Sequence, residues 1–296
     1  MTETSLTSFF ENWELFRASA LAGTLAGALL GWLGVYVVLR RMIFLSAALS
    51  QTAGLGVAAS FYARIHWGVS GLAAEPTLGA AAATLATTFL LAGGRGRQRG
   101  VRRDATLGLA WLLGAAGTLA IGTRIVQEVQ DIQSILFGSA VAVLDEDFDR
   151  VVTLSAVLAA LHLWWRRGFL AAAFDAEGAR VRGLPVWLLD FVLLCTLALA
   201  ISLCTRVLGA LPVFAFSVLP ALAAISVVRT VNGALALAAA LGAVAGFGGY
   251  LLAYRLELPV GGAQTLLAIA LVAVTTLVGR GRARLFPDLP PSAVTP

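Results

Sequence analysis

The sequence predicts an all-α, polytopic transmembrane bundle of about eight or nine helices. Of its 296 residues, 59% are hydrophobic and 12% are charged, whereas soluble proteins average about 25% charged residues. The mean hydropathy is +0.88. The apolar residues also gather in blocks that approach the ~20 residues needed to cross a bilayer core. A soluble domain of this size needs more polar surface, and a disordered chain has far less apolar surface to bury.

Nine apolar blocks follow one another along the chain. The first, 18–39, is too long for the apolar region of a signal peptide and lacks a small-residue cleavage site, so we expect a retained helix. Two later blocks adjoin each other, and we expect the break between them near Arg206. After the first, the blocks are 44–62, 77–93, 105–122, 150–165, 186–205, 207–228, 232–252 and 262–279.

The arginines predict the orientation of the bundle. Cytoplasmic loops of membrane proteins carry an excess of Lys and Arg, and all 21 basic residues here are Arg. With the N-terminus outside, 15 of those 21 arginines fall on the cytoplasmic side. Acidic residues collect on the opposite side, which agrees with this orientation. Because the arginines stand in short runs between apolar blocks, they indicate loops and not a nucleic-acid surface.

The two ends of the chain differ from the blocks. Segment 1–16 is amphipathic, with several aromatic residues, and we expect it to lie in the outer membrane interface. The Pro-rich stretch 286–296 is expected to be a flexible tail.

Many glycines lie within the predicted helices. Gly23, Gly27, Gly31 and Gly34 share one helical face and would permit close approach of a neighbouring helix. Gly242, Gly246, Gly248 and Gly249 form a similar face later. Such faces occur in transporters and channels, but they are also the ordinary packing device of any bundle.

The sequence offers few arrangements of residues that are typical of a catalytic site. Ser155 and His162 lie seven residues apart on one predicted helix, too far to act as a Ser–His pair, so we interpret His162 as a packed residue and expect no enzyme activity and no cofactor. Cys195 and Cys204 would lie more than ~13 Å apart on one helix, which excludes a disulfide between them.

A few charged segments are candidates for function. An ionisable residue within the membrane is a functional candidate by default, and Asp190 is the main one, although it could instead extend to the inner interface. The acidic run 145–149 could attract cations or a basic partner, or be a solvated loop. Segment 174–185 is polar and ends at Gly183 and Pro185, and it is either a short helix that docks a soluble partner or an ordinary loop.

Five segments resemble motifs of the zinc/manganese/iron ABC transporter permeases, the integral membrane subunits of metal importers. They occur in the family's order over nearly the whole chain. They are residues 34–51, the LFGS segment 136–139 before an acidic stretch, 174–179 with Gly183, 206–221, and 258–262.

The resemblance implies a type II ABC importer permease fold and a set of partners. Residues 1–285 would form a single permease domain in the inner (plasma) membrane of a bacterium, with a cytoplasmic coupling segment at 166–185. A cytoplasmic ATP-binding subunit would power transport, an extracytoplasmic metal-binding protein would deliver the ion, and a second copy would complete a homodimer. The residues implied to couple to the ATPase are Asp175, Ala176, Glu177, Gly178, Ala179 and Gly183.

The sequence departs from the family at the usual metal-contacting pair. Where the family carries an acidic residue and a histidine, this chain has Ala47 and Gln51. Three interpretations stay open: the pathway passes the ion with few ligands, other groups such as Asp190 or Glu257 substitute, or the substrate is not a transition metal. The residues implied for the pathway are Ala47, Ser50, Gln51, Asp190 and Pro220.

The function predicted on these grounds is the permease of an ATP-driven importer of divalent metal ions, with zinc or manganese first and iron next. A stand-alone channel or secondary carrier is the alternative from another class, but a cation carrier is expected to place several ionisable groups at mid-membrane. A degenerate family member that transports no metal is the other alternative, suggested by Ala47 and Gln51.

Overall fold

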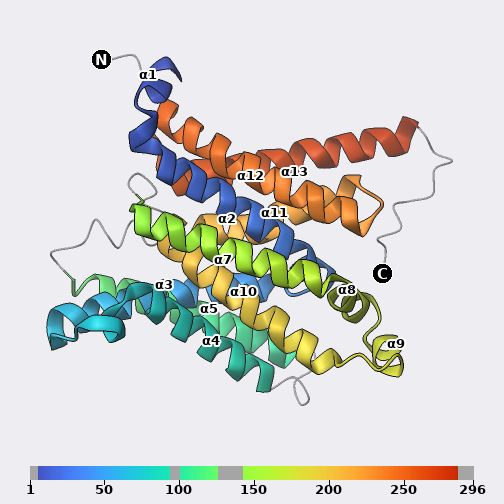
Figure 1. The fold of residues 1–296 in the computed structure, drawn as a ribbon, viewed down its shortest axis with the longest axis horizontal. Helices are drawn as coiled ribbons and strands as arrows, with labels where there is room; N and C mark the ends of the chain where they lie inside the picture. Colours follow the sequence, from blue (N-terminus) through green and yellow to red (C-terminus); the bar gives the residue numbers. More distant parts are fainter. Residues whose placement is uncertain (1–5, 94–100, 126–142, 286–296) are drawn as a thin grey trace.

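The computed structural model describes residues 6–93, 101–125 and 143–285, and all of its regular elements are helices. Each predicted apolar block corresponds to one long helix (Figure 1). These helices are α2 (Trp13–Leu39), α3 (Ile43–Trp67), α4 (Pro76–Gly93), α5 (Val101–Gly122), α7 (Asp145–Trp164), α10 (Val186–Leu208), α11 (Ala210–Val227), α12 (Val231–Leu256) and α13 (Val260–Leu285).

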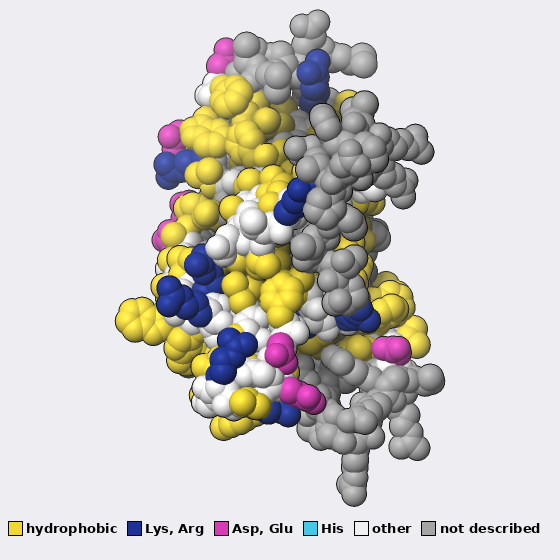
Figure 2. Space-filling model, turned by 90° about the vertical axis from the view of Figure 1, so that its right-hand side faces the viewer, with side chains coloured by type: hydrophobic (Ala, Val, Ile, Leu, Met, Phe, Trp, Pro, Cys, Tyr) yellow, Lys and Arg dark blue, Asp and Glu magenta, His cyan; other side chains and the backbone are white. Residues whose placement is uncertain are grey.

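Seven of the described helices are long and apolar enough to cross a membrane. The two other long helices are α4, which has 18 residues, and α7, whose first turn is acidic. The long helices run alternately in opposite directions along the chain, so the described connections α2–α3, α7–α10 and α11–α12 share one end of the bundle (Figure 1). Figure 2 looks onto this end and shows arginine side chains spread over it among hydrophobic ones.

Short helices complete the described chain. The outer connection between α3 and α4 contains the 3₁₀ helix η1 (Gly71–Ala74), and α8 (Arg166–Phe174) and α9 (Ala176–Val181) follow α7 at the inner end (Figure 1). At the N-terminus, α1 (Leu6–Glu11) leads into α2. Phe9 of α1 is fully buried and stacks on Phe16, with Tyr250 and Tyr254 of α12 around it. This aromatic cluster ties the amphipathic segment to the bundle.

The break between α10 and α11 differs from the prediction. We expected it near Arg206, but α10 continues to Leu208 and the break occurs at Gly209. Gly209 has φ 92° and ψ 162°, a conformation that is essentially restricted to glycine. Arg206 stays helical because its guanidinium is paired with Asp147 of α7, 3.4 Å away, and so needs no exit to solvent.

The predicted glycine face of α2 packs on Gly242 and Gly246, which belong to the second predicted glycine face, on α12. A methyl group built on Gly27 would lie 2.8 Å from the carbonyl carbon of Gly242, and one built on Gly246 would lie 2.6 Å from that of Gly23. We call this contact between α2 and α12 the glycine seam. Its backbones touch because neither helix presents a side chain there.

Candidate functional site

The predicted coupling segment forms a capped helix at the inner end. Asp175 is the N-cap of α9, and its Oδ1 accepts a hydrogen bond from the backbone N–H of Gly178 at 2.8 Å. Such a cap satisfies a backbone donor that would otherwise lack a partner. Glu177 is exposed, whereas Ala179 is fully buried against the bundle. The helix therefore exposes Glu177, Arg180 and the apolar Val181, and it rests on Ala179.

A tight turn joins α9 to α10. The N–H of Leu184 donates to the carbonyl of Ala179 at 3.0 Å, and that of Gly183 donates to Arg180 at 2.9 Å. Gly183 has φ +78°, which places it in the left-handed region that favours glycine. This closure resembles the common glycine-based end of a helix, and it brings the chain directly into α10 at Val186.

The implied pathway residues of α3 lie in the interior. Ala47 is 8% exposed and Ser50 is fully buried, and the Ser50 hydroxyl donates to the carbonyl of Ala47 at 3.0 Å. Gln51 is half-buried where α3 crosses α5. A methyl group at Gly114 of α5 would lie 2.6 Å from the Gln51 carbonyl carbon, so the two backbones touch there.

The side-chain atoms on this stretch of α3 that could ligate a metal ion are oxygens. Apart from Gln51, they are the hydroxyls of Ser46, Ser50 and Thr52, all buried. The Ser46 hydroxyl has no hydrogen-bond partner within the described part of the chain. Over residues 6–93, 101–125 and 143–285, no group of three His, Cys, Asp or Glu side chains could hold a metal ion. This region thus offers neutral oxygen atoms and no charged ligand cluster.

Asp190 is engaged in an ion pair. It lies one turn into α10 and contacts Arg40, the C-cap residue of α2, at the inner end of the bundle. The Arg40 side chain is 10% exposed and that of Asp190 is 30% exposed. Asp190 thus holds α10 and the end of α2 together at the inner interface.

Pro220 lies inside α11 and is buried. Its ring faces α2, because a methyl group on Gly31 would lie 3.3 Å from the Pro220 Cβ. A proline within a helix removes one backbone hydrogen bond and favours a local bend. The structure therefore places Pro220 at a helix contact, next to the glycine seam.

An outer charge cluster was not predicted. Asp147 is only 8% exposed and pairs with Arg150 at 3.1 Å and with Arg206 at 3.4 Å, while Arg150 also contacts Glu75 at 3.0 Å. Of the alternatives for the run 145–149, solvation fits the exposed Asp145, Glu146 and Asp149, whereas Asp147 is buried and paired in the first turn of α7. The spacing of Asp147 and Arg150 was a signal for a helical pair, but the partner Arg206 lies 59 residues away.

His162 is a packed residue, as expected. Its ring is fully buried, stacks on Phe169 with centroids 4.6 Å apart, and forms a hydrogen bond through Nε2 with the Thr196 hydroxyl at 2.9 Å. Cys195 and Cys204 of α10 are free cysteines. None of these groups forms a catalytic arrangement with another in the described chain.

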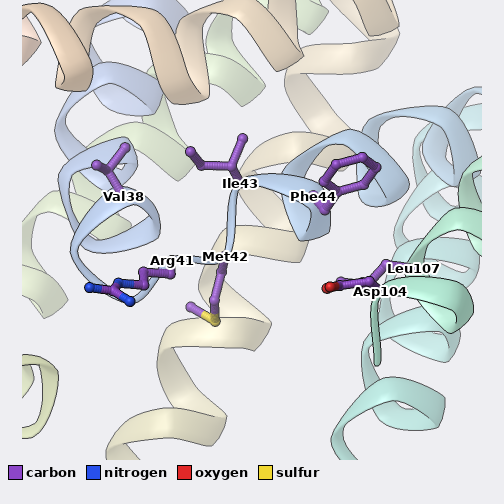
Figure 3. Close-up of a pocket in the computed structure, with 7 residues that line it drawn as sticks. All are labelled: Val38, Arg41, Met42, Ile43, Phe44, Asp104 and Leu107. Carbon is purple, nitrogen blue, oxygen red and sulfur yellow. The ribbon is translucent and has the colours of Figure 1, made fainter. Parts of the chain in front are cut away.

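A cavity of about 210 Å³ lies at the inner end, between the α2–α3 corner and α5 (Figure 3). Arg41 and Met42 line one side, and Asp104 and Leu107 line the other. The neighbouring guanidinium groups of Arg40 and Arg41 thus have different surroundings. The first is buried against Asp190, and the second is exposed beside this cavity.

Two predicted features lie outside the described residues. These are the LFGS segment 136–139 and the tail 286–296.

Comparison with known proteins gives one consistent result. The ABC 3 transport family matches residues 12–279 of the chain. The manganese transport system membrane protein MntC of Listeria monocytogenes is 24% identical over 93% of this chain and 94% of its own length. A probable iron transport system membrane protein of Haemophilus influenzae is 24% identical over 92% and 96%. The solved structure of PsaBC from Streptococcus pneumoniae in complex with Fab shares the fold, with a TM-score of 0.79, 22% identity and coverage of 92% of this chain and 95% of that one.

Proposed function

The chain belongs to the ABC 3 transport family, and on that premise we propose that it is the membrane permease of an importer for manganese(II). A multi-pass permease of a metal ABC importer is not itself an enzyme, and the ATP is hydrolysed elsewhere. The relatives named for manganese and iron transport support a first-row divalent ion as the substrate.

The donor chemistry of α3 favours manganese within that class. Zinc prefers imidazole and thiolate ligands, whereas manganese is well served by carbonyl, carboxylate and water oxygens. The stretch around Ser50 and Gln51 offers hydroxyl and amide oxygens, α3 contains no Cys, and its one histidine, His66, lies in the last turn of the helix. Weak neutral ligands also suit a pathway, since an ion that binds tightly leaves slowly.

The inner end of the bundle is the place where a soluble ATP-binding subunit would bind. We propose that α9 is the coupling helix and that its exposed face, with Glu177, Arg180 and Val181, docks a cytoplasmic ATP-binding subunit. Ala179 and the turn at Gly183 anchor that helix to α10, so a displacement of α9 reaches the membrane helices. An extracytoplasmic binding protein and a second permease copy complete the proposed importer, which works by rigid-body rocking between two states.

Metal accumulation tests the substrate. Cells that lack this chain should contain less manganese when grown at low manganese, as measured by elemental analysis, and expression of the intact chain should restore it. Iron and zinc in the same samples serve as internal controls. Unchanged manganese together with a loss of iron or zinc would reject manganese and name the ion instead.

Copurification tests the coupling helix. Asp175→Ala removes the N-cap acceptor of a six-residue helix and should reduce recovery of the ATP-binding subunit about fivefold, which corresponds to the ~1 kcal/mol of a lost cap. Asp175→Asn retains an acceptor oxygen and is the matched control. Both variants should insert normally into the membrane. Equal recovery of the ATP-binding subunit with Asp175→Ala and Asp175→Asn would contradict the role of α9 as the coupling helix.

A further inference from the structure

We propose that the ion pair between Arg40 and Asp190 transmits the movement of α9 to α3, which makes these two side chains positioning residues for transport. The inference rests on the proposed function of α9 as the coupling helix. It adds a route through the protein, from the inner surface to the helix that carries Ala47 and Gln51.

The first step of the route is the stiff connection between α9 and α10. The backbone hydrogen bond from Leu184 to Ala179 closes the turn, and Ala179 is fully buried. Behind the turn, α8 packs closely on α10, because a methyl group on Gly168 would lie 3.2 Å from Cδ1 of Leu189. A push on α9 is therefore passed to the first turns of α10, where Asp190 lies.

The second step is the ion pair itself. Arg40 is nine-tenths buried, and among the described residues its Nε and Nη2 atoms have no hydrogen-bond partner. Asp190 is the carboxylate that compensates its charge. Separating such a pair leaves an uncompensated buried charge, which is strongly unfavourable. When α10 moves, the end of α2 is thus held to it.

The third step is the corner between α2 and α3. The N–H of Arg40 donates to the Tyr36 carbonyl at 3.0 Å, and the N–H of Met42 donates to Val37 at 2.8 Å. Helix α3 begins at Ile43, so Ala47 follows after about one turn and Gln51 after about two. A displacement at Arg40 consequently reaches the implied pathway residues over a short, hydrogen-bonded stretch.

Both charged residues of α10 are paired with neighbouring helices. Its only acidic and basic residues are Asp190 and Arg206, and both are paired, with α2 at the inner end and with α7 at the outer end. The helix is therefore attached to a different neighbour at each end. Movement entering from α9 meets the α2 attachment first.

The test uses the full importer, reconstituted in liposomes with its ATP-binding subunits and supplied with manganese(II). We compare Arg40→Gln, Asp190→Asn and the charge swap Arg40→Asp/Asp190→Arg with the parent chain. The neighbouring Arg41→Gln, which removes an exposed guanidinium beside the cavity of Figure 3, is the matched control. The readout is manganese transported per ATP hydrolysed, in complexes checked for full subunit content.

Each single variant should hydrolyse ATP at a rate near that of the parent but transport about tenfold less manganese per ATP, a typical size for coupling between sites. The charge swap should recover most of this ratio, and Arg41→Gln should leave it unchanged. A purely structural pair would lower the amount of assembled complex without changing the ratio.

Two results would overturn the proposal: single variants with the parental ratio, or a charge swap that assembles fully and stays uncoupled. Failure of the proposed function would look different, since the parent chain itself would then bind no ATP-binding subunit or transport no manganese.

Discussion

At the scale of single residues, the proposed ion pathway is distinguished by two side chains. Ala47 and Gln51 occupy positions where the resemblance implies an acidic residue and a histidine, and the structure buries Ala47 beside the Ser50 hydroxyl. The surroundings are neutral, and they favour an ion that accepts oxygen ligands. We therefore propose that Ala47 and Gln51 set the ion preference on this stretch of α3.

Installing the family's pair should change that preference. Ala47→Asp together with Gln51→His adds a carboxylate and an imidazole one turn apart, a combination that binds zinc well. We expect the ratio of zinc to manganese accumulated by cells to rise about tenfold, the lower end of the range for changes at metal sites. Elemental analysis measures it.

The same chemistry placed elsewhere on α3 provides the control. Ala59→Asp with Ala63→His repeats the spacing near the outer end of the helix, where Ala59 is exposed. This pair should leave the ratio unchanged. A shift of equal size with both pairs would contradict a pathway at Ala47 and Gln51.

Sequence patterns reveal some of these residues and miss others. Resemblance identified Asp175 and Gly178, and the cap between them is local enough to be recognised from their spacing of three residues. The pairing of Arg40 with Asp190 joins residues 150 positions apart, and that of Asp147 with Arg206 joins residues 59 apart. Such pairs depend on how helices are arranged, which hydropathy and spacing do not contain.

Whole helices were predicted well because the bilayer imposes a length on them. Each of the nine apolar blocks corresponds to one long helix, although α3 and α12 extend beyond the apolar part to Trp67 and Leu256. The exception is the boundary at Gly209, where backbone conformation and a distant ion pair outweigh the local charge of Arg206.

Helix packing at the glycine seam should be intolerant of added volume. Gly27→Ala places a methyl group against the backbone of Gly242, and overpacking of this kind destabilises by about 1–3 kcal/mol. We expect a lower melting temperature in detergent, followed by the loss of the monodisperse peak in size-exclusion chromatography.

Gly262→Ala is the matched control for Gly27→Ala, because a methyl group at Gly262 would have no atom within 4 Å. It should melt at or above the temperature of the parent chain. Equal destabilisation by both would show that the effect is not one of close packing.

At the scale of the molecule, charge separates the two ends of the bundle. Exposed arginines such as Arg41, Arg180 and Arg229 lie at the end that carries α9, and the acidic start of α7 lies at the other. Between the ends, large apolar side chains on α5 and α13 are exposed, among them Leu113 and Leu266. This distribution fits a lipid-facing belt with a basic cytoplasmic rim.

Labelling from each side of the membrane tests this orientation. In a chain with Cys195→Ala and Cys204→Ala, Glu177→Cys should react with an impermeant maleimide only from the cytoplasmic side, and Ser70→Cys only from the outside. Both positions are exposed. Labelling of Glu177→Cys in intact cells would reverse the topology and remove the basis for a cytoplasmic coupling helix.

The glycine seam has a consequence for how this family member can vary over evolutionary time. Gly27 and Gly242 have no side chain to shorten, so every substitution at these sites can only add atoms to a gap that holds none. Natural variation on α2 and α12 is therefore expected at positions that face away from the seam, while Gly27 and Gly242 are inherited together.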